Sequence, residues 1–243
     1  MTEVERGAAA GLAAPGAGAA STPAAALPSR AALSWWKVAR ALVLTPGWFF
    51  WRPVMVGREN LPQAAPYILA PVHRSYVDTL LCCYLTRRRL RFMAKSGVFT
   101  KPWAAKLFSS LGGFPVRRGA PDREALQNCQ RALAAGEPVV LFAEGRRSSG
   151  PVVAPLLAGP AYLALRANLP VVPVGIAGSE QSMPIGASRV RPVRIYLVVG
   201  RPIWPPPRSG VGRVPRTMVD QLTGRLQSEL QAAFDQARSM ASD

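Results

Sequence analysis

The chain has 243 residues, 49% of them hydrophobic and 18% charged, which is enough apolar material for one globular domain. The 30 lysines and arginines against 13 acidic residues give a formal net charge of +17, which favours an anionic partner. Three cysteines without C-x-x-C spacing and a single histidine exclude a disulfide framework, a zinc finger and a histidine-rich metal centre. These features indicate a reducing, cytoplasmic compartment, and no metal or other cofactor is expected.

Residues 1–29 have the composition of a disordered tail. They consist mainly of Ala, Gly, Pro and Ser, and they lack the basic start and the apolar run of a signal peptide. Residues 30–52 are expected to form a separate amphipathic segment, and residues 53–243 a single folded domain without internal repeats.

The segment 30–52 is expected to begin with a helix near Leu33. An apolar face at helical spacing is made by Trp35, Val38, Ala39 and Leu42. Pro46 and Gly47 are expected to end this helix, and four aromatic residues, 48–51, follow. The segment is too interrupted to span a bilayer, whereas tryptophans beside lysine and arginine are typical of a helix in the headgroup layer. The alternative is that these aromatic side chains cover the protein core.

From Pro53 onward, short apolar runs alternate with helical patterns. The expected strands are 54–56, 67–70, 91–94, 114–116, 139–142, 171–174 and 193–199. The expected helices are 77–85, 102–109, 122–135, 158–167 and 214–237. This alternation predicts an α/β domain with a central mixed sheet flanked by helices, in which ligands bind where strands end.

The only histidine, His73, follows one of these strands and precedes a helical pattern, so it is expected in a strand-to-helix loop. Asp78 lies five residues later, in the first helical turn, where its carboxylate can hold one imidazole nitrogen and leave the other free to take a proton. Between Glu59 and Asp122, Asp78 is the only acidic residue among many basic ones. The alternative is structural, because Ser75 and Asp78 match a capping box; the two interpretations are compatible.

Basic side chains follow the predicted strand 114–116. Gly112 and Gly113 allow a tight turn into this strand, and Arg117 and Arg118 come at its end. Arginine suits phosphate because its planar guanidinium offers paired donors and stays charged. The alternative is an ordinary solvated basic turn.

A third group of polar side chains follows the predicted strand 139–142. Gly145 allows close approach of the backbone, and Arg147 and Ser148 are candidates for binding an oxyanion. Glu144 is a candidate for holding either a substrate hydroxyl or an arginine. The alternative is a loop held by salt bridges.

Together with an apolar V-P-V stretch, these groups resemble, in this order, the motifs of the glycerolipid acyltransferase family, of the lysophosphatidic acid acyltransferase (PlsC) type. The matching residues are His73 and Asp78; Gly112, Val116 and Arg118; Phe142, Glu144, Gly145, Arg147 and Ser148; and Val172, Pro173 and Val174. The resemblance covers about residues 54–201. Val72, Ala143 and Arg146 stand where the family has Asn, Pro and Thr, and the additional arginines leave the identity of the acceptor open.

The resemblance implies a 1-acylglycerol-3-phosphate O-acyltransferase of phospholipid biosynthesis. His73 would act as the general base, oriented by Asp78, and the hydroxyl of lysophosphatidic acid would attack the thioester of acyl-CoA or acyl carrier protein directly. The absence of a G-x-S-x-G nucleophile elbow agrees with direct attack. The expected substrate pocket consists of Arg118, Glu144, Gly145, Arg147 and Ser148. The expected partners are the acyl donor, a lysophospholipid and an anionic membrane surface, and the expected location is the inner face of the cell membrane.

Other functions stay open at the level of sequence. Nucleic-acid binding would use the positive charge, but zinc-finger, RNP-type and bZIP patterns are absent, so no nucleic-acid partner is expected. A non-catalytic module that binds anionic lipid, a thioesterase that needs no acceptor, and an acyltransferase acting on glycerol 3-phosphate or another lysolipid are the remaining alternatives. Cys82 and Cys83 either line an acyl tunnel or only pack.

Overall fold

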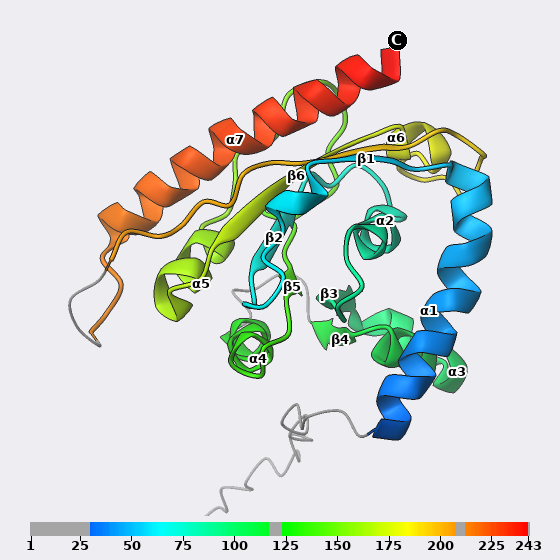
Figure 1. Ribbon diagram of the computed structural model, residues 1–243, viewed down its shortest axis with the longest axis horizontal. Coiled ribbons are helices and arrows are strands. Elements are labelled where there is room, and N and C mark those ends of the chain that lie inside the picture. Colours follow the sequence, from blue (N-terminus) through cyan, green and yellow to red (C-terminus); the bar gives the residue numbers. More distant parts are fainter. Residues whose placement is uncertain (1–29, 117–122, 208–211, 243) are drawn as a thin grey trace, which may run out of the picture.

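The computed structural model describes residues 30–116, 123–207 and 212–242 (Figure 1). The expected tail, residues 1–29, lies outside the described residues, and so do Arg117 and Arg118. The strands are β1 (Val54–Val56), β2 (Ile68–Pro71), β3 (Arg91–Lys95), β4 (Gly113–Val116), β5 (Val139–Val140), β6 (Val171–Ala177) and β7 (Tyr196–Val199). The α-helices are α1 (Arg30–Trp51), α2 (Asp78–Leu85), α3 (Pro102–Ser110), α4 (Arg123–Ala134), α5 (Gly159–Ala167), α6 (Ser179–Ser182) and α7 (Arg216–Ser242).

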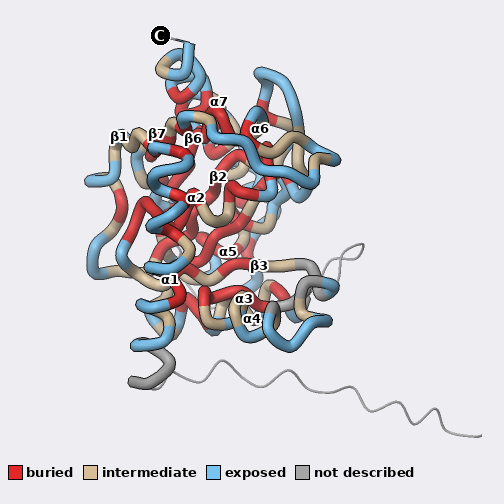
Figure 2. The backbone as a smooth tube through the Cα atoms, turned by 90° about the vertical axis from the view of Figure 1, so that its right-hand side faces the viewer, coloured by how far each residue is buried: buried red, intermediate tan, exposed pale blue. Residues whose placement is uncertain are grey.

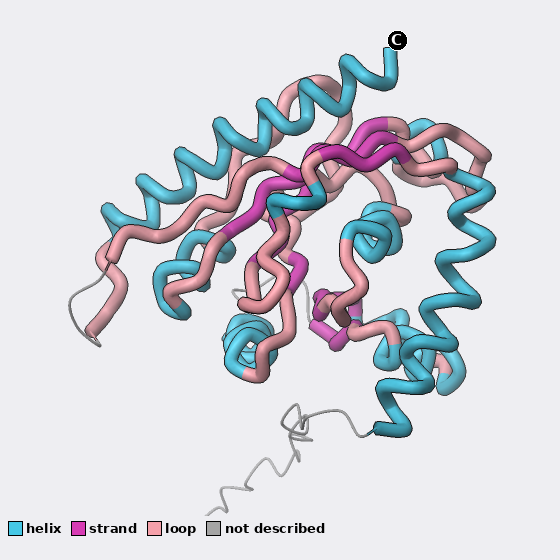
Figure 3. The backbone as a smooth tube through the Cα atoms, in the orientation of Figure 1, coloured by secondary structure: helices cyan, strands magenta, loops and turns pink. Residues whose placement is uncertain are grey.

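The strands of the described part form one seven-stranded sheet with the order β1-β7-β6-β2-β5-β3-β4. Figure 3 shows the strands in magenta, with helices on either side. The five strands from β6 to β4 in this order are parallel, whereas β7 runs antiparallel to β6 and β1 runs parallel to β7. The predicted α/β fold with a mixed sheet is therefore confirmed. Because the carboxyl ends of parallel strands lie at the same edge, the loops that follow β2 and β5 converge there.

Successive residues of a strand point to opposite faces of the sheet, so each strand presents side chains to both faces. Helices cover both of these faces. In β6, Val174 and Ile176 belong to the core that includes Leu81 of α2. Ala177 at the end of the same strand packs with Ala233 of α7 instead. The helices α1, α2 and α3 lie toward one side of the sheet and α4, α5 and α7 toward the other (Figure 1), and the strands between them are mostly buried (Figure 2).

Gly175 lets α7 lie directly against β6. A Cβ atom at this position would overlap the carbonyl oxygen of Ala233 and the backbone nitrogen of Phe234. The helix backbone therefore occupies the space that a side chain at Gly175 would need, and glycine is required here for close approach.

Helix α1 continues through Pro46 and Gly47, so the expectation that these residues end it is wrong. Pro46 lies on the exposed side of the helix, where water can pair the carbonyl that the proline ring leaves without an N–H partner. Gly47 is buried against α2, and a Cβ atom there would overlap the Tyr84 hydroxyl. That hydroxyl donates a hydrogen bond to the carbonyl of Leu44 at 2.7 Å, which holds this turn of α1 against α2.

Helix α1 carries two apolar faces. Toward the protein it buries Ala39, Leu44 and Trp51. Away from the protein it exposes the side chains of Trp35, Val38, Leu42 and Phe49 by 45%, 48%, 68% and 76%. The alternative that this segment covers the protein core therefore holds only for the face that includes Trp51. Across the described ranges, none of the helices combines the length and the apolar character that crossing a membrane requires.

Several further element boundaries differ from the sequence expectation, among them the end of β6, which extends to Ala177 rather than to residue 174. β5 ends at Val140 rather than at residue 142, because the chain turns soon after it and Gly145 adopts a positive φ of 68°. β7 begins at Tyr196, three residues later than expected, and α7 extends to Ser242. The additional residues at the C-terminal end of α7 bury little surface, so the spacing of apolar residues does not predict that the helix continues through them.

Candidate active site

His73 and Asp78 meet at the carboxyl end of β2, as predicted. His73 lies in the loop after β2, and Asp78 is the first residue of α2. Nδ1 of His73 is 3.0 Å from Oδ2 of Asp78, with the imidazole 13% exposed and the carboxylate fully buried. A carboxylate at this distance selects the tautomer with the proton on Nδ1, so Nε2 is left as the basic nitrogen.

Asp78 is itself fixed by the start of α2. Its Oδ2 accepts hydrogen bonds from the backbone N–H groups of Arg74, at 2.6 Å, and Ser75, at 2.7 Å. The second contact is one half of the expected capping box. In place of the other half, the Ser75 hydroxyl oxygen accepts the N–H of Val77 at 3.4 Å, and the hydroxyl donates to the carbonyl of Met183 at 2.8 Å. The capping contact and the histidine contact share one carboxylate oxygen, so the two interpretations of Asp78 hold together.

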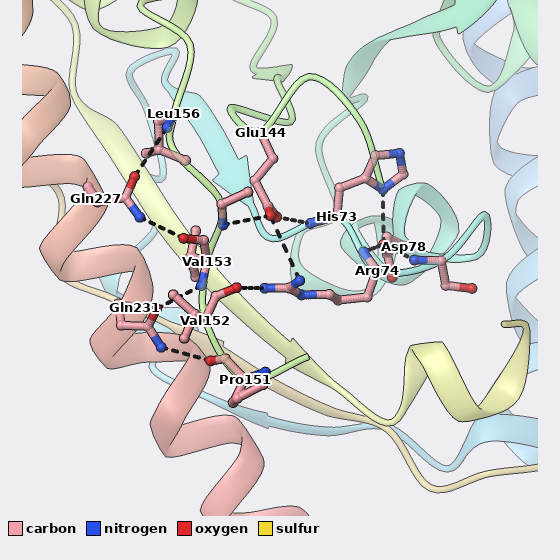
Figure 4. Close-up of polar contacts among 12 residues, drawn as sticks. His73, Arg74, Asp78, Glu144, Pro151, Val152, Val153, Leu156, Gln227 and Gln231 are labelled. Carbon is pink, nitrogen blue, oxygen red and sulfur yellow. Dashed lines mark hydrogen bonds and ion pairs between the residues drawn. The ribbon is translucent and has the colours of Figure 1, made fainter. Parts of the chain in front are cut away.

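The loop after β5 contacts His73 from the other side (Figure 4). The ring of Phe142 stacks on the imidazole, with centroids 4.0 Å apart and planes inclined by 24°. Oε1 of Glu144 accepts the backbone N–H of His73 at 2.8 Å, and the N–H of Ser148 donates to the His73 carbonyl at 2.9 Å. Both backbone polar groups of the histidine are therefore held by the motif that follows β5.

Glu144 bonds to the protein through both carboxylate oxygens. Oε2 accepts the N–H of Ala154 at 3.1 Å and lies 3.9 Å from Nη1 of Arg74, which is itself buried. Arg74 also donates from Nη2 to the carbonyl of Val152 at 3.2 Å. Of the two alternatives for Glu144, the geometry favours the one in which it holds an arginine.

This arrangement lies in a segment that matches a known protein family. The family model described as Acyltransferase matches residues 52–177, slightly more than half of the chain, including the histidine and both acidic residues. The chain belongs to the acyltransferase family.

Several curated proteins are similar to this acyltransferase. A 1-acyl-sn-glycerol-3-phosphate acyltransferase of Chlamydomonas reinhardtii is 32% identical over 162 residues, covering 64% of this chain and 48% of that protein. The protein of the same name from Bacillus subtilis (strain 168) is 27% identical over 147 residues, covering 60% of this chain and 71% of that protein. The chain spans about half the length of the algal relative and of the chloroplastic BAT2 protein of Brassica napus, of which 46% is covered.

A solved structure shows that the fold of this acyltransferase extends beyond the segment matched by the family model. The crystal structure of the 1-acyl-sn-glycerophosphate (LPA) acyltransferase PlsC from Thermotoga maritima superposes with a TM-score of 0.71 at 22% sequence identity. The superposition covers 86% of this chain and 82% of that one, so it includes elements on both sides of the matched segment.

The other predicted residues after β5 lie in the same loop as Glu144. Gly145 makes the turn with positive φ, and a Cβ atom there would overlap the side chain of Leu157. The guanidinium carbon of Arg147 lies 3.5 Å from the ring centroid of Tyr76. Within the described residues, the buried Nη1 of Arg147 and Oγ of Ser148 have no hydrogen-bond partner. Both groups therefore keep unused capacity to donate a hydrogen bond.

The fourth motif is part of the core, and one predicted residue falls outside the described part. Val172, Pro173 and Val174 are buried in β6, and this strand pairs with β2. Arg118 follows β4 and is not among the described residues, so its role in binding phosphate stays a prediction.

Sequence reasoning missed three residues that contact this network. Arg74 stands next to His73 as one of many basic residues in this stretch, and its neighbours in the sequence do not indicate that it is buried. Gln227 and Gln231 of α7 bind the loop 151–156, as described below. The sequence does contain an indication of this contact. The two glutamines lie four residues apart and directly follow the apolar Leu226 and Leu230, where a solvated polar face is not expected.

The three cysteines are buried in the core. Burial raises the pKa of Cys82 well above its ordinary value, that of Cys83 to about 11 and that of Cys129 to about 12. The thiols are therefore un-ionised at neutral pH and unsuited to nucleophilic attack. Cys82 and Cys83 pack with the apolar residues around α2.

Proposed function

We propose that this acyltransferase transfers a fatty acyl group from acyl-CoA or acyl carrier protein to the free hydroxyl of lysophosphatidic acid, with His73 as the general base. The observation that carries the proposal is the contact of 3.0 Å between Nδ1 of His73 and Oδ2 of Asp78, in a chain of the acyltransferase family. The names of the curated relatives support lysophosphatidic acid as the acceptor.

The proposed reaction proceeds by direct attack. The acceptor hydroxyl gives its proton to Nε2 of His73 while its oxygen forms a bond to the carbonyl carbon of the thioester. Asp78 stabilises the imidazolium that results. The tetrahedral intermediate then collapses, the carbon–sulfur bond breaks, and the thiol leaves with the proton that His73 returns. The high pKa values of the buried cysteines support a route without an acyl-enzyme.

The acceptor phosphate is assigned to the basic groups around this histidine. Arg147 and Ser148 offer buried donors on one side of His73. Arg118, which follows β4 in the sequence, is proposed as the principal phosphate ligand. Gly145 gives the loop the turn it needs, and Glu144 is proposed to act by holding the loop rather than by touching the acceptor.

The proposal is tested by following free CoA thiol from palmitoyl-CoA in mixed micelles with purified protein. Release is expected with lysophosphatidic acid and not in its absence. Release that depends on glycerol 3-phosphate instead would keep the chemistry and change the acceptor. Release without any acceptor would indicate a thioesterase, and binding of lipid without release would indicate a non-catalytic module.

We also propose that α1 lies on an anionic membrane surface at the inner face of the cell membrane. Its outer face exposes Trp35, Leu42 and Phe49, and Trp103 of the neighbouring helix α3 is 67% exposed. Basic side chains lie beside this apolar surface in a groove between α1 and the end of α2, lined among others by Trp36, Lys37, Arg40, Trp48 and Arg87. Exposed aromatic residues next to cations are suited to the boundary between headgroups and acyl chains.

Replacing Leu42 and Phe49 together by glutamate is expected to weaken binding to vesicles of phosphatidylcholine and phosphatidylglycerol by roughly 10²-fold or more. Each apolar side chain contributes about 1.5–3 kcal/mol when it leaves water, and each glutamate adds a charge that anionic lipid repels. Sedimentation with vesicles measures the effect. Trp204→Glu is the matched control, since Trp204 is 55% exposed but follows β7, and equal binding by both variants would contradict the membrane role of α1.

A further inference from the structure

Helix α7 lies outside the residues matched by the family model, yet one of its faces reaches the site. It packs on β6 and β7. Gln227, Gln231 and Phe234 follow one another at intervals of four and three residues, which places them on one side of the helix. All three contact either the loop after β5 or the arginine next to His73.

The two glutamines bind the backbone of the loop between β5 and α5, which has no regular secondary structure there (Figure 4). Gln231 accepts the N–H of Val153 at 2.8 Å and donates to the carbonyl of Pro151 at 3.1 Å. Gln227 accepts the N–H of Leu156 at 3.2 Å and donates to the carbonyl of Val153 at 3.1 Å. Each side-chain amide therefore both donates and accepts. Together the two amides pair backbone N–H and C=O groups of the loop that a neighbouring strand would otherwise pair.

The same stretch of loop holds the residues behind His73. Between the two glutamine contacts, Val152 accepts from Nη2 of Arg74 at 3.2 Å, and Ala154 donates to Oε2 of Glu144 at 3.1 Å. Glu144 in turn accepts the backbone N–H of His73. Phe234 of α7 completes the link, since its ring centroid lies 4.5 Å from the guanidinium carbon of the buried Arg74.

We propose that Gln227 and Gln231 are positioning residues for the acyl transfer, and that α7 fixes the histidine through the loop, Arg74 and Glu144. This inference rests on the proposed role of His73 as the base. Its physical basis is that a general base must lie within hydrogen-bond reach of the proton it takes, and small displacements are costly: about 1 Å can reduce the rate by about 10²-fold. The loop bonds to α7 at Pro151 and Val153 on one side of the Glu144 contact and at Leu156 on the other, so its position follows that of the helix.

The test replaces both glutamines by methionine, which keeps the length and packing of the side chains and removes all four hydrogen bonds to the loop. It also removes the hydrogen bond of 2.9 Å that Gln231 donates to Asp235 within α7. Far below the melting temperature, kcat with lysophosphatidic acid and palmitoyl-CoA is expected to fall by roughly 10–100-fold, with KM within about twofold of wild type. Gln221→Met and Gln236→Met on the exposed side of α7 are the matched controls, and both are expected to keep wild-type kcat.

A second readout does not depend on turnover. His73 is the only histidine, so the ¹H and ¹⁵N signals of a histidine side chain in the NMR spectrum belong to it alone. These signals are expected to shift in the double methionine variant and to stay in place in the two controls. If the double variant does not fold, the single variants decide, because each keeps two of the four hydrogen bonds.

The outcomes separate this inference from the proposed function. Unchanged kcat and unchanged histidine signals, with only a lower melting temperature, would show that the glutamines are merely structural and would overturn the inference. If wild type releases no CoA with any acceptor, the proposed function fails instead, and the histidine signals still report whether α7 positions His73.

Discussion

Substitution of His73 by alanine is expected to lower acceptor-dependent release of CoA by about 10²–10⁴-fold, because this is the typical contribution of a positioned general base. The imidazole is the only side chain of its kind in the protein, so no second histidine can replace it. The measurement is the thiol assay with lysophosphatidic acid, run on wild type and variant at equal binding to micelles. Since the ring is partly exposed, the variant is expected to fold and to keep its affinity for lipid.

Asp78→Asn is the companion variant. The amide keeps the shape of the side chain but can present its N–H₂ group to Nδ1, which favours the wrong tautomer of His73. It also removes the charge that stabilises the imidazolium, so kcat should fall while KM changes little. Wild-type activity in either variant would contradict the role of the pair as the base.

Substitution of Arg74 by methionine is expected to lower the free energy of unfolding by about 3–5 kcal/mol, because it leaves the carboxylate of Glu144 buried without its cationic neighbour. The guanidinium of Arg74 is 1% exposed, and the Glu144 side chain is fully buried, so solvent cannot replace the lost charge. Unfolding in urea, followed by circular dichroism, measures the change.

A double-mutant cycle separates the ion pair from packing. Adding Glu144→Gln to Arg74→Met removes the unpaired charge, so the double variant should be less destabilised than the sum of the single variants. The matched control is Arg238→Met, since its ion pair with Asp235 is exposed and should contribute roughly 0–1 kcal/mol. Additive effects in the cycle would show that Arg74 and Glu144 do not stabilise each other.

The sequence was sufficient for the parts of the site that depend on local order along the chain. The strand before His73 and the helix beginning near Asp78 were both readable from apolar spacing, and their junction fixes the contact between the two side chains. In these cases the relevant information lies within about ten residues of the site.

The remainder of the site depends on contacts between distant parts of the chain. Nothing near Glu144 indicates that its partner is Arg74, because the choice among many arginines is made by burial under Phe234 of α7. The same holds for Gly47, whose neighbours suggest a helix end although its role is to admit Tyr84 of α2. Spacing rules describe the backbone of one element, whereas these residues are explained only by what packs against them.

The pairing of β1 with β7 has a consequence for the order of events during synthesis. Helix α1 is made first, but its C-terminal end is held by segments made late: Trp51 donates from Nε1 to Ser182, and its carbonyl accepts the N–H of Ile195. Contacts between such distant residues form slowly, because a long loop must close first. The end of α1 and the adjoining edge strand can therefore reach their final places only after β7 has left the ribosome. During that interval the tryptophan and phenylalanine side chains of α1 have been synthesised but the sheet has not yet formed. A nearby lipid surface would therefore be available to these side chains before the sheet is complete.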